Sequence, residues 1–543
     1  MSAGTDQTWL GDPFDDANPA GFAHAARRRH DGEPPKELVD EARRRGFALA
    51  YTPAGWGGAL RDPVTAGRQV REVVTRDADA MTALLMHLTP VLLGGLLGTP
   101  ERRERLVRRV GAGEDLAYAL SEREHGADLL SMSTTAQHLG DRVVLSGRKW
   151  LVGLAPSASA FVVVARSEGR GPAAFSAYVV PADAPGVRVS APRPTDGFSG
   201  TRFADVEFDQ VSLPASALLG PRGGALEAVL RSQTVVRALS LPGALGCADA
   251  DRMLLARFAA QRRGGAQLGQ DPLFRADAGR VAGAMLLAEA AAEAALDALA
   301  AAPESAALVS ALSKHAVVES VAAAHAVVGR LLASRGVLAD GVWGMHAKVA
   351  ADARVVGTID GSEVATLRAV AAFLPRCLSD DAGRHAANPG TGTAAAELDP
   401  AAIGVAPPTR DPALDRLAAL DPSSALSRNA HVTALRSAIE THRQAAAGIG
   451  RTPRPMRQAA LVEHARRHAW LSSAAGAVVA ASSGPTGPLA DAVGDGWLDA
   501  ALDHALGQAE APRPGHLTDR VAWGAALLDA TTAQLDDWTT DAR

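Results

Sequence analysis

Residues 203–220 read FADVEFDQVSLPASALLG, and this stretch says most about the fold. Apolar and polar residues alternate from Ala204 to Phe208, which is the pattern of a strand with one buried face. The proline and glycine that follow are typical of the turns that end strands. The stretch therefore predicts the closing strand of a sheet that ends near residue 220.

Other short β-rich runs precede this strand, with turn-forming Gly, Pro and Asp between them. They are VVLSG (143–147), FVVVAR (161–166), SAYVVP (176–181) and VRVS (187–190). Runs of this length and spacing indicate a compact antiparallel sheet or barrel rather than a parallel one, and we expect it to span residues 116–222.

Helical patterns flank the predicted sheet on both sides. Before it, residues 1–115 form an N-terminal helical domain with helices expected at 34–46, 64–98 and 100–111. After it, long segments at 224–262, 273–300, 304–335 and 345–375 predict a four-helix bundle over 223–380. An Ala/Gly/Pro/Thr-rich linker (381–408) and a C-terminal helical domain (409–543) follow. The expected class is α+β, mainly α.

Bulk properties exclude several classes of protein. With 543 residues, a net charge of −5 and a pI near 6.3, the chain gives no electrostatic reason to expect nucleic-acid binding. Cys247 and Cys377 are the only cysteines, which excludes a disulfide framework and a cysteine-based metal site and suits the cytoplasm. The acidic start lacks the features of a secretory signal, and the most apolar stretches carry acids, so we expect no membrane span.

Nucleotide-binding motifs of the common kinds are missing. No GxGxxG follows a strand and no GxxxxGK[ST] occurs, so the usual Rossmann and P-loop sites are unsupported. His464 and His468 have ligand spacing on a helix, and Glu122 and His125 form ExxH. Neither pair has further ligands in the sequence, and we interpret both as ordinary polar positions.

The segment ALSEREHGAD (119–128) is the first candidate for chemistry. A loop of this composition can present backbone N–H groups and the Ser121 hydroxyl to a flat polar ligand. The alternative is a turn that only connects a helix to a strand.

The segment GRKWLVG (147–153) is the second candidate. Trp150 is either a core anchor, as is common for an aromatic residue in a strand, or a partner that stacks beside a ring system. Gly153 would let the backbone approach a ligand closely.

The third candidate is Asp360 in DARVVGTIDGSEV (352–364), near the expected end of the last bundle helix. An Asp-Gly pair is often only a helix stop. A buried carboxylate here would instead have a raised pKa and would suit a general base that works near neutral pH.

Together these segments resemble the acyl-CoA dehydrogenase family over roughly residues 20–378. ALSEREHGAD is similar to the family's A-L-T-E-P-x-x-G-S-D flavin loop, and GRKWLVG is similar to its G-x-K-x-(W/Y)-I-T strand. FADVEFDQVSLPASALLG resembles the F-x-D-V-x-V-P-x-x-x-L-L-G signature. RALSLPGALG (237–246) and the step from Asp352 to Asp360 keep the spacing of the family's bundle motifs.

The resemblance implies a bound FAD and α,β-dehydrogenation, or oxidation, of an acyl thioester carried on CoA or a carrier protein. Asp360 would take the place of the family's catalytic glutamate, with Arg237 near it. The cofactor-binding residues implied by the same resemblance are Leu120, Ser121, Gly126, Trp150, Val152, Gly153, Arg262 of a neighbouring subunit, and Ser362.

Several positions differ from the family pattern, among them Ala127 for the loop serine and Gly153 for the strand threonine. Two alternatives follow. The first is a flavin-dependent monooxygenase on the same fold, which needs no α-base. The second is a relative that has lost FAD and performs no redox chemistry.

The C-terminal extension contains 13 arginines and no lysine against 15 acids, which argues against a DNA-binding tail. We therefore expect an acyl thioester substrate and neither nucleic acid nor membrane as a partner. The electron acceptor stays open, and the resemblance implies a homodimer or homotetramer.

Overall fold

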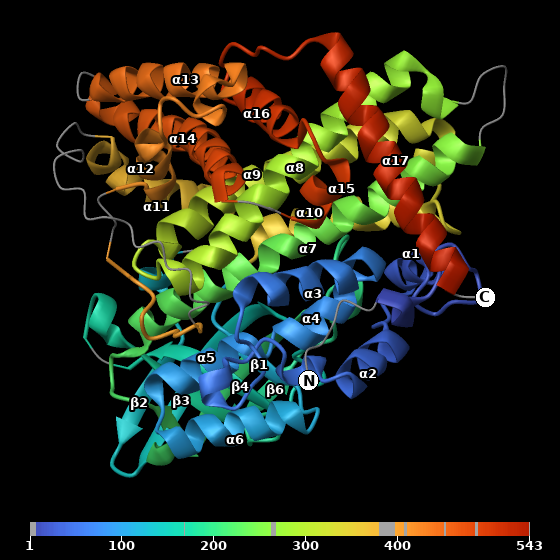
Figure 1. Cartoon of the computed structure of the whole chain (residues 1–543). Helices are drawn as coiled ribbons and strands as arrows, with labels where there is room; N and C mark the ends of the chain where they lie inside the picture. The colour runs from blue at the N-terminus through green and yellow to red at the C-terminus, as the bar shows by residue number, and fades with distance from the viewer. Residues whose placement is uncertain are drawn as a thin grey trace.

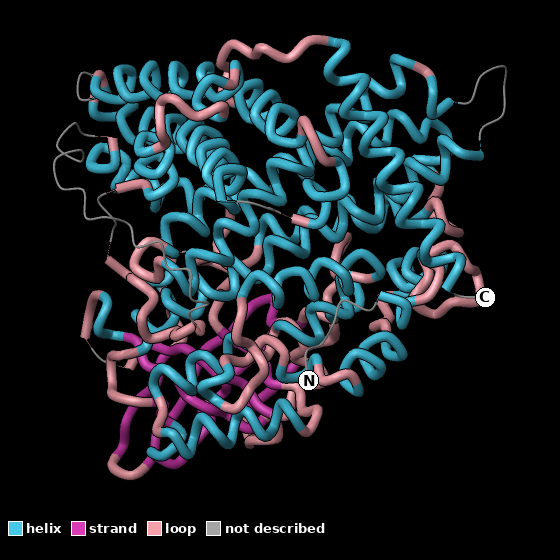
Figure 2. The backbone as a smooth tube through the Cα atoms, in the orientation of Figure 1, coloured by secondary structure: helices cyan, strands magenta, loops and turns pink. Residues whose placement is uncertain are grey.

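The computed structural model describes residues 7–126, 128–167, 169–261, 268–378, 397–406, 410–449, 452–483 and 487–541. Figure 1 shows the sheet and the N-terminal helices at the bottom, a layer of long helices in the middle and most of the C-terminal helices above them, with the last helix descending along the right-hand side. The strands gather in one corner of an otherwise helical molecule (Figure 2). The predicted α+β, mainly α class is confirmed.

Six helices form the N-terminal region: α1 (Phe22–Asp31), α2 (Lys36–Arg44), α3 (Pro63–Arg76), α4 (Ala78–Leu85), α5 (Leu88–Leu97) and α6 (Pro100–Gly111). The single helix expected at 64–98 is wrong, because the chain breaks twice. Asp77 leaves the helical conformation and caps α4 by accepting from the N–H of Asp79. A second short break at Met86 and His87 separates α4 from α5.

The sheet consists of β1 (Leu116–Ala119), β2 (Thr135–Leu139), β3 (Arg142–Val152), β4 (Ala160–Arg166), β5 (Phe175–Pro181), β6 (Val187–Val189), β7 (Ala204–Pro214) and β8 (Leu218–Leu219). Its order is β6-β7-β3-β2-β4-β5-β8, with β1 beside β4. Most pairs are antiparallel, but β1 and β4 pair in parallel over four residues and β2 meets β4 in parallel at one position. The sheet is thus mixed rather than purely antiparallel.

The bundle contains α7 (Ala225–Gln261), α8 (Pro272–Ala301), α9 (Ala306–Leu332), α10 (Gly344–Thr358) and α11 (Glu363–Cys377). The helix expected at 345–375 is wrong in one respect: it is two helices with a break at Ile359–Ser362. Asp360 has a left-handed φ of +53° and Gly361 a φ of +97°, so neither can continue a helix. The break places Asp360 in a turn, not at a helix end.

The C-terminal region contains α12 (Pro412–Ala419), α13 (Ala430–Ala447), α14 (Arg454–Ser483), α15 (Pro488–Val493), α16 (Trp497–Gln508) and α17 (Leu517–Asp541). Helices α14, α16 and α17 pack on α8, and α14 also packs on α9 and α11 (Figure 1). One apolar core therefore runs through the N-terminal helices, the bundle and this region. Most of the expected linker lies outside the described residues, and the domain boundaries stay a prediction.

Two helical stretches, Ala78–Leu97 and Ala306–Val337, are long and apolar enough to cross a membrane. Of their most apolar windows, 72% and 50% are buried inside the protein. Core helices of globular proteins have the same composition, so these stretches are weak evidence for a membrane span.

Candidate active site

A cavity of about 870 Å³ lies between the sheet, the N-terminal helices and the bundle. Cavities of this size accommodate cofactors and substrates. It brings together most of the residues that the sequence singled out: Leu120, Ser121, Gly126, Trp150, Gly153, Arg237, Asp360 and Ser362. Four separate segments of the chain thus converge on one space.

Glu122 anchors the loop that carries Ser121 and Gly126 through hydrogen bonds. The Glu122 carboxylate accepts hydrogen bonds from the backbone N–H groups and hydroxyls of Ser133 and Thr134 at 2.6–2.9 Å. The buried Lys149 ammonium donates to the same carboxylate at 3.0 Å and to the carbonyl of Leu120 at 2.9 Å. Glu122 is therefore an anchor for the loop, a function that the ExxH pattern did not indicate.

Charge and burial act against each other in this anchor. Burial tends to raise the pKa of Glu122, but Lys149 and the donors of Ser133 and Thr134 lower it to about 2. Burial lowers the pKa of Lys149 to about 8 although Glu122 raises it. The carboxylate is ionised at neutral pH and is saturated with donors.

A β-bulge in β3 shapes the wall opposite the bundle. The register with β7 shifts between Lys149 and Val152, and Leu151 has a left-handed φ of +50°. Trp150 and Leu151 consequently both line the cavity, although neighbouring strand residues normally face opposite sides. The Trp150 N–H donates to the carbonyl of Ser121 at 2.9 Å, which joins this wall to the loop.

Gly153 follows the bulge, and its lack of a side chain matters for packing. A Cβ at this position would lie 2.4 Å from the sulfur of Met86, which also lines the cavity. Met86 thus fills the space that a side chain at position 153 would need.

The turn that carries Asp360 is held by two cations. The Arg237 Nε donates to the backbone carbonyl of Asp360 at 2.9 Å, and the ammonium of Lys314 donates to the carbonyl of Ile359. Among the described residues, nothing hydrogen-bonds to the carboxylate of Asp360 or to its backbone N–H. Both groups therefore remain available to a ligand in the cavity.

The electrostatics of the turn follow from its burial. Burial raises the pKa of Asp360, and the nearby charges of Lys314 and Arg237 offset part of that rise. Burial lowers the pKa of Lys314 to about 7, against the opposing influence of Asp360. A carboxylate with a raised pKa that faces a cavity is suited to proton abstraction near neutral pH.

Sequence reasoning missed Lys314 and Tyr118. Lys314 is one of only four lysines, but a lysine in a helix is not a signal by itself. Tyr118 lines the cavity, and its hydroxyl is buried without a hydrogen-bond partner in the described part of the chain. Burial and the charge of Asp360 both raise the pKa of Tyr118, which keeps its hydroxyl protonated.

Asp352, which lies eight residues before Asp360, fixes helix α10 to neighbouring segments of the chain. The Asp352 carboxylate accepts from the N–H of Phe198 at 2.8 Å and from Lys348 at 2.9 Å. Lys348 also binds Asp77 and Asp79 at 3.1 Å, so a buried network ties α10 to α3 and α4. This network positions the helix that leads into Asp360.

The remaining predicted residues have different outcomes. The side chain of Val152 does not line the cavity and packs in the sheet core instead, because the bulge reverses its direction. Ser362 lines the cavity and also caps α11 by accepting from the N–H of Ala365. Arg262 lies outside the described residues.

Comparison with known proteins agrees with this geometry. Residues 20–114 match the model of the acyl-CoA dehydrogenase N-terminal domain, and residues 117–211 match that of the middle domain. Residues 20–211 of the chain thus carry the N-terminal and middle domains of the acyl-CoA dehydrogenase family. The resemblance seen in the sequence is thereby confirmed.

Individual members of the acyl-CoA dehydrogenase family are distant. Cyclohexane-1-carbonyl-CoA dehydrogenase of Geobacter metallireducens is 30% identical over 216 residues, 38% of this chain and 56% of that protein. A solved structure of FkbI, for biosynthesis of a methoxymalonyl extender unit, is 27% identical with a TM-score of 0.56, and covers 63% of this chain and 93% of FkbI. The prolyl acyl carrier protein oxidase AnaB shares the fold, at 18% identity, with a TM-score of 0.55 over 66% of this chain and 99% of AnaB.

The chain spans little more than half the length of the curated relatives that it matches, 62% and 54% in two cases. The matched segments of the family models end at residue 211, so the cavity wall formed by the bundle lies beyond them.

Proposed function

We propose that this protein is a member of the acyl-CoA dehydrogenase family that performs FAD-dependent α,β-dehydrogenation, or oxidation, of an acyl thioester. The observation that carries the proposal is the turn at Asp360. Asp360 lines the cavity, and its carboxylate and N–H have no hydrogen-bond partners among the described residues, while Arg237 and Lys314 hold the carbonyls of Asp360 and Ile359. A rigid turn with a free base and a free donor is what α-proton abstraction requires.

The residues act on the substrate in two ways. The Asp360 carboxylate accepts the α-proton, and burial keeps its pKa above the ordinary range so that it can do so. The free backbone N–H of Asp360 is a donor for the thioester carbonyl, on which negative charge develops as the proton leaves. Arg237 and Lys314 place positive charge beside the same turn and limit the rise in pKa.

Three observations indicate that the cavity can accommodate a flavin. It joins the loop at Ser121 and Gly126 to the turn at Asp360, its sheet-side wall carries Trp150, and its volume is large. Leu120, Ser121, Gly126, Trp150, Gly153 and Ser362 would hold the cofactor there. When bound, FAD supplies the acceptor for the β-hydride. The names of two similar proteins refer to CoA and to an acyl carrier protein, and we propose that one of these two carriers bears the acyl group here.

An absorption spectrum tests the proposal. The purified protein, as isolated or after incubation with FAD, should show flavin bands that bleach under anaerobic conditions with a set of acyl-CoA and acyl-pantetheine thioesters. Asp360→Asn should keep the bands and lose the bleaching. Glu363→Gln changes a neighbouring acid that does not line the cavity, and this control should bleach like the parent protein.

Two results would overturn the proposal. A protein that stays colourless after incubation with FAD would favour the relative without redox chemistry. A flavoprotein whose turnover with oxygen persists in Asp360→Asn would favour the monooxygenase, because that reaction needs no α-base.

A further inference from the structure

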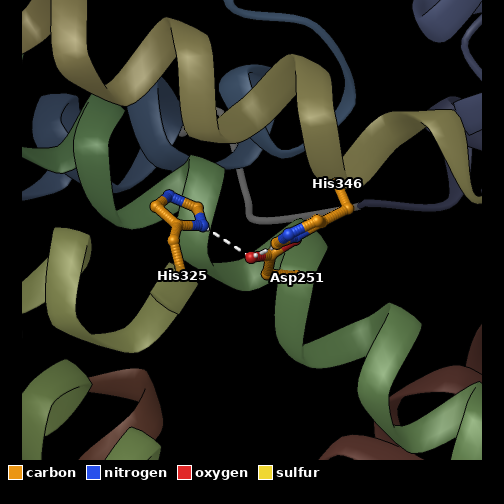
Figure 3. A group of neighbouring side chains, drawn as sticks. All are labelled: Asp251, His325 and His346. Atoms are coloured by element: carbon orange, nitrogen blue, oxygen red, sulfur yellow. Dashed lines mark hydrogen bonds and ion pairs between the residues drawn. The ribbon is translucent and has the colours of Figure 1, made fainter. Parts of the chain in front are cut away.

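We propose that Asp251, His325 and His346 form a binding site for one divalent transition-metal ion of the zinc class. The three side chains meet inside the bundle, away from the cavity, and come from α7, α9 and α10 (Figure 3). Because their positions are separated by 74 and 21 residues, no sequence motif marks the group.

The donor atoms converge. The Nδ1 atom of His325 lies 2.5 Å from one carboxylate oxygen of Asp251, and the Nδ1 atom of His346 lies 2.8 Å and 3.0 Å from the two oxygens. All three donors lie within 4.8 Å of one another, the only such group among the described residues. Zinc binds imidazole nitrogen and carboxylate oxygen at about 2.0–2.2 Å. A tetrahedral ion at this bond length holds its ligand atoms about 3.4 Å apart, so the 2.5 Å separation of His325 and Asp251 would have to open by about 0.9 Å as the ion replaced the hydrogen-bond proton.

Charge provides a second argument, independent of distance. Several other buried carboxylates have an arginine or lysine partner: Arg71 contacts Asp249 and Glu289, and Lys348 contacts Asp77, Asp79 and Asp352. In the described part of the chain, Asp251 contacts imidazoles alone. Its buried negative charge must be balanced by a proton on an imidazole or by a metal ion.

On the side away from Asp251, the two imidazoles have different surroundings. Gly329 lies against His346, and a Cβ there would lie 2.8 Å from the His346 Nε2. The Nε2 of His325 is buried without a hydrogen-bond partner among the described residues, so no contact on that side decides which ring nitrogen carries the proton. An ion at the Nδ1 atom of His325 would move the ring proton to Nε2, which has no acceptor among the described residues.

Three protein donors leave a fourth coordination position for water, and the site would join three helices. Helix α7 also carries Arg237, α9 carries Lys314, and α10 leads into Asp360. An ion here would hold together the helices that position the base turn. The inference does not depend on the proposed reaction.

A matched comparison exists in the C-terminal region. Asp411 is buried and its carboxylate lies 2.9 Å from the Nε2 of His468, also with an imidazole as its partner. It has one imidazole instead of two, and the same carboxylate caps α12 through the N–H groups of Ala413 and Leu414. His468→Gln is therefore the control variant, although His442 and His464 are close to His468.

The experiment is a titration of chelator-treated full-length protein with Co²⁺, followed by visible absorption, and with Zn²⁺, followed by calorimetry and thermal unfolding. One equivalent of Co²⁺ should produce ligand-field bands, and Zn²⁺ should raise the Tm. In His325→Ala and His346→Gln, affinity should fall by at least about 100-fold, since even outer partners of metal ligands contribute 10–100-fold. His468→Gln should bind like the parent protein.

Three results would overturn the proposal: no saturable Co²⁺ or Zn²⁺ binding by the parent protein, binding unchanged in both His325→Ala and His346→Gln, or binding lost in His468→Gln. The titration of the parent protein decides the first case by itself, even if a variant fails to fold. Unchanged circular dichroism in the variants would separate loss of ligands from loss of structure.

Discussion

Two carboxylates near the cavity have opposite surroundings: Glu122 is buried beneath the loop that lines the cavity, and Asp360 lines the cavity and is partly exposed. Glu122 accepts four hydrogen bonds from Ser133 and Thr134 and a further one from Lys149, and its pKa falls to about 2. Asp360 also lies near a lysine, but Lys314 and Arg237 donate to backbone carbonyls of the turn rather than to its carboxylate. Burial then raises the pKa of Asp360.

The difference separates a carboxylate that stabilises structure from one that is available for chemistry. Donors that saturate Glu122 remove its basicity and fix the loop. Cations that fix the backbone of Asp360 hold its position and leave its basicity in place. Four substitutions test this contrast.

Glu122→Gln should cost about 3–5 kcal/mol of unfolding free energy, because it leaves the buried Lys149 ammonium without its carboxylate. Urea denaturation measures the loss. Glu124→Gln, on the exposed side of the same loop, should stay within about 0.5 kcal/mol of the parent protein. Equal stability of the two variants would contradict the assignment of Glu122 as an anchor.

Gly153→Thr should cost about 1–3 kcal/mol, because its Cβ would overlap the sulfur of Met86. Met86→Ala removes that sulfur, so the double variant should recover most of the loss and show a coupling in a double-mutant cycle. Thermal unfolding of the four proteins gives the result. Additive losses would mean that Met86 does not occupy this space.

Lys314→Met should shift the acid limb of the pH–rate profile upward by about one unit, because an opposite charge near a carboxyl lowers its pKa by one unit or more. Asp360 works only when ionised, so activity is lost as pH falls through its raised pKa. Without Lys314 that loss begins at higher pH. Lys36→Met, on the exposed face of α2, should leave the profile unchanged. A downward shift would contradict the geometry.

Asp360→Asn should raise stability at neutral pH by about 0.5–2 kcal/mol, as is typical when a strained functional position is relieved. A carboxyl whose folded pKa is raised favours folding when protonated, and this contribution is lost as pH rises through that pKa. Asparagine also tolerates the left-handed φ of +53°. Denaturation at pH 7 and at pH 4 should show a gain at pH 7 and a smaller one at pH 4. The exposed Asp340→Asn is the control, and a net loss at pH 7 would count against an unsatisfied carboxylate.

Much of the architecture could be predicted from local patterns. Short β-rich runs located β3 to β7, of which β7 alternates strictly, and helical periodicity located α2 and α6 to α9. The family motifs located the loop at Ser121 and the base candidate Asp360. Cytoplasmic location and oligomeric state remain predictions, and the electron acceptor stays open.

Local sequence patterns were enough to place most strands and helices and the motifs that border the cavity, because these patterns depend on neighbours within a few positions. The tertiary structure alone decided the rest. The bulge in β3 turned Leu151 toward the cavity and Val152 into the core, since one inserted residue reverses the alternation of a strand. The turn at Asp360 is held by Arg237 and Lys314, which are distant in sequence. Because these two cations bind backbone carbonyls, the carboxylate and the N–H of Asp360 stay free, unlike the carboxylate of Glu122.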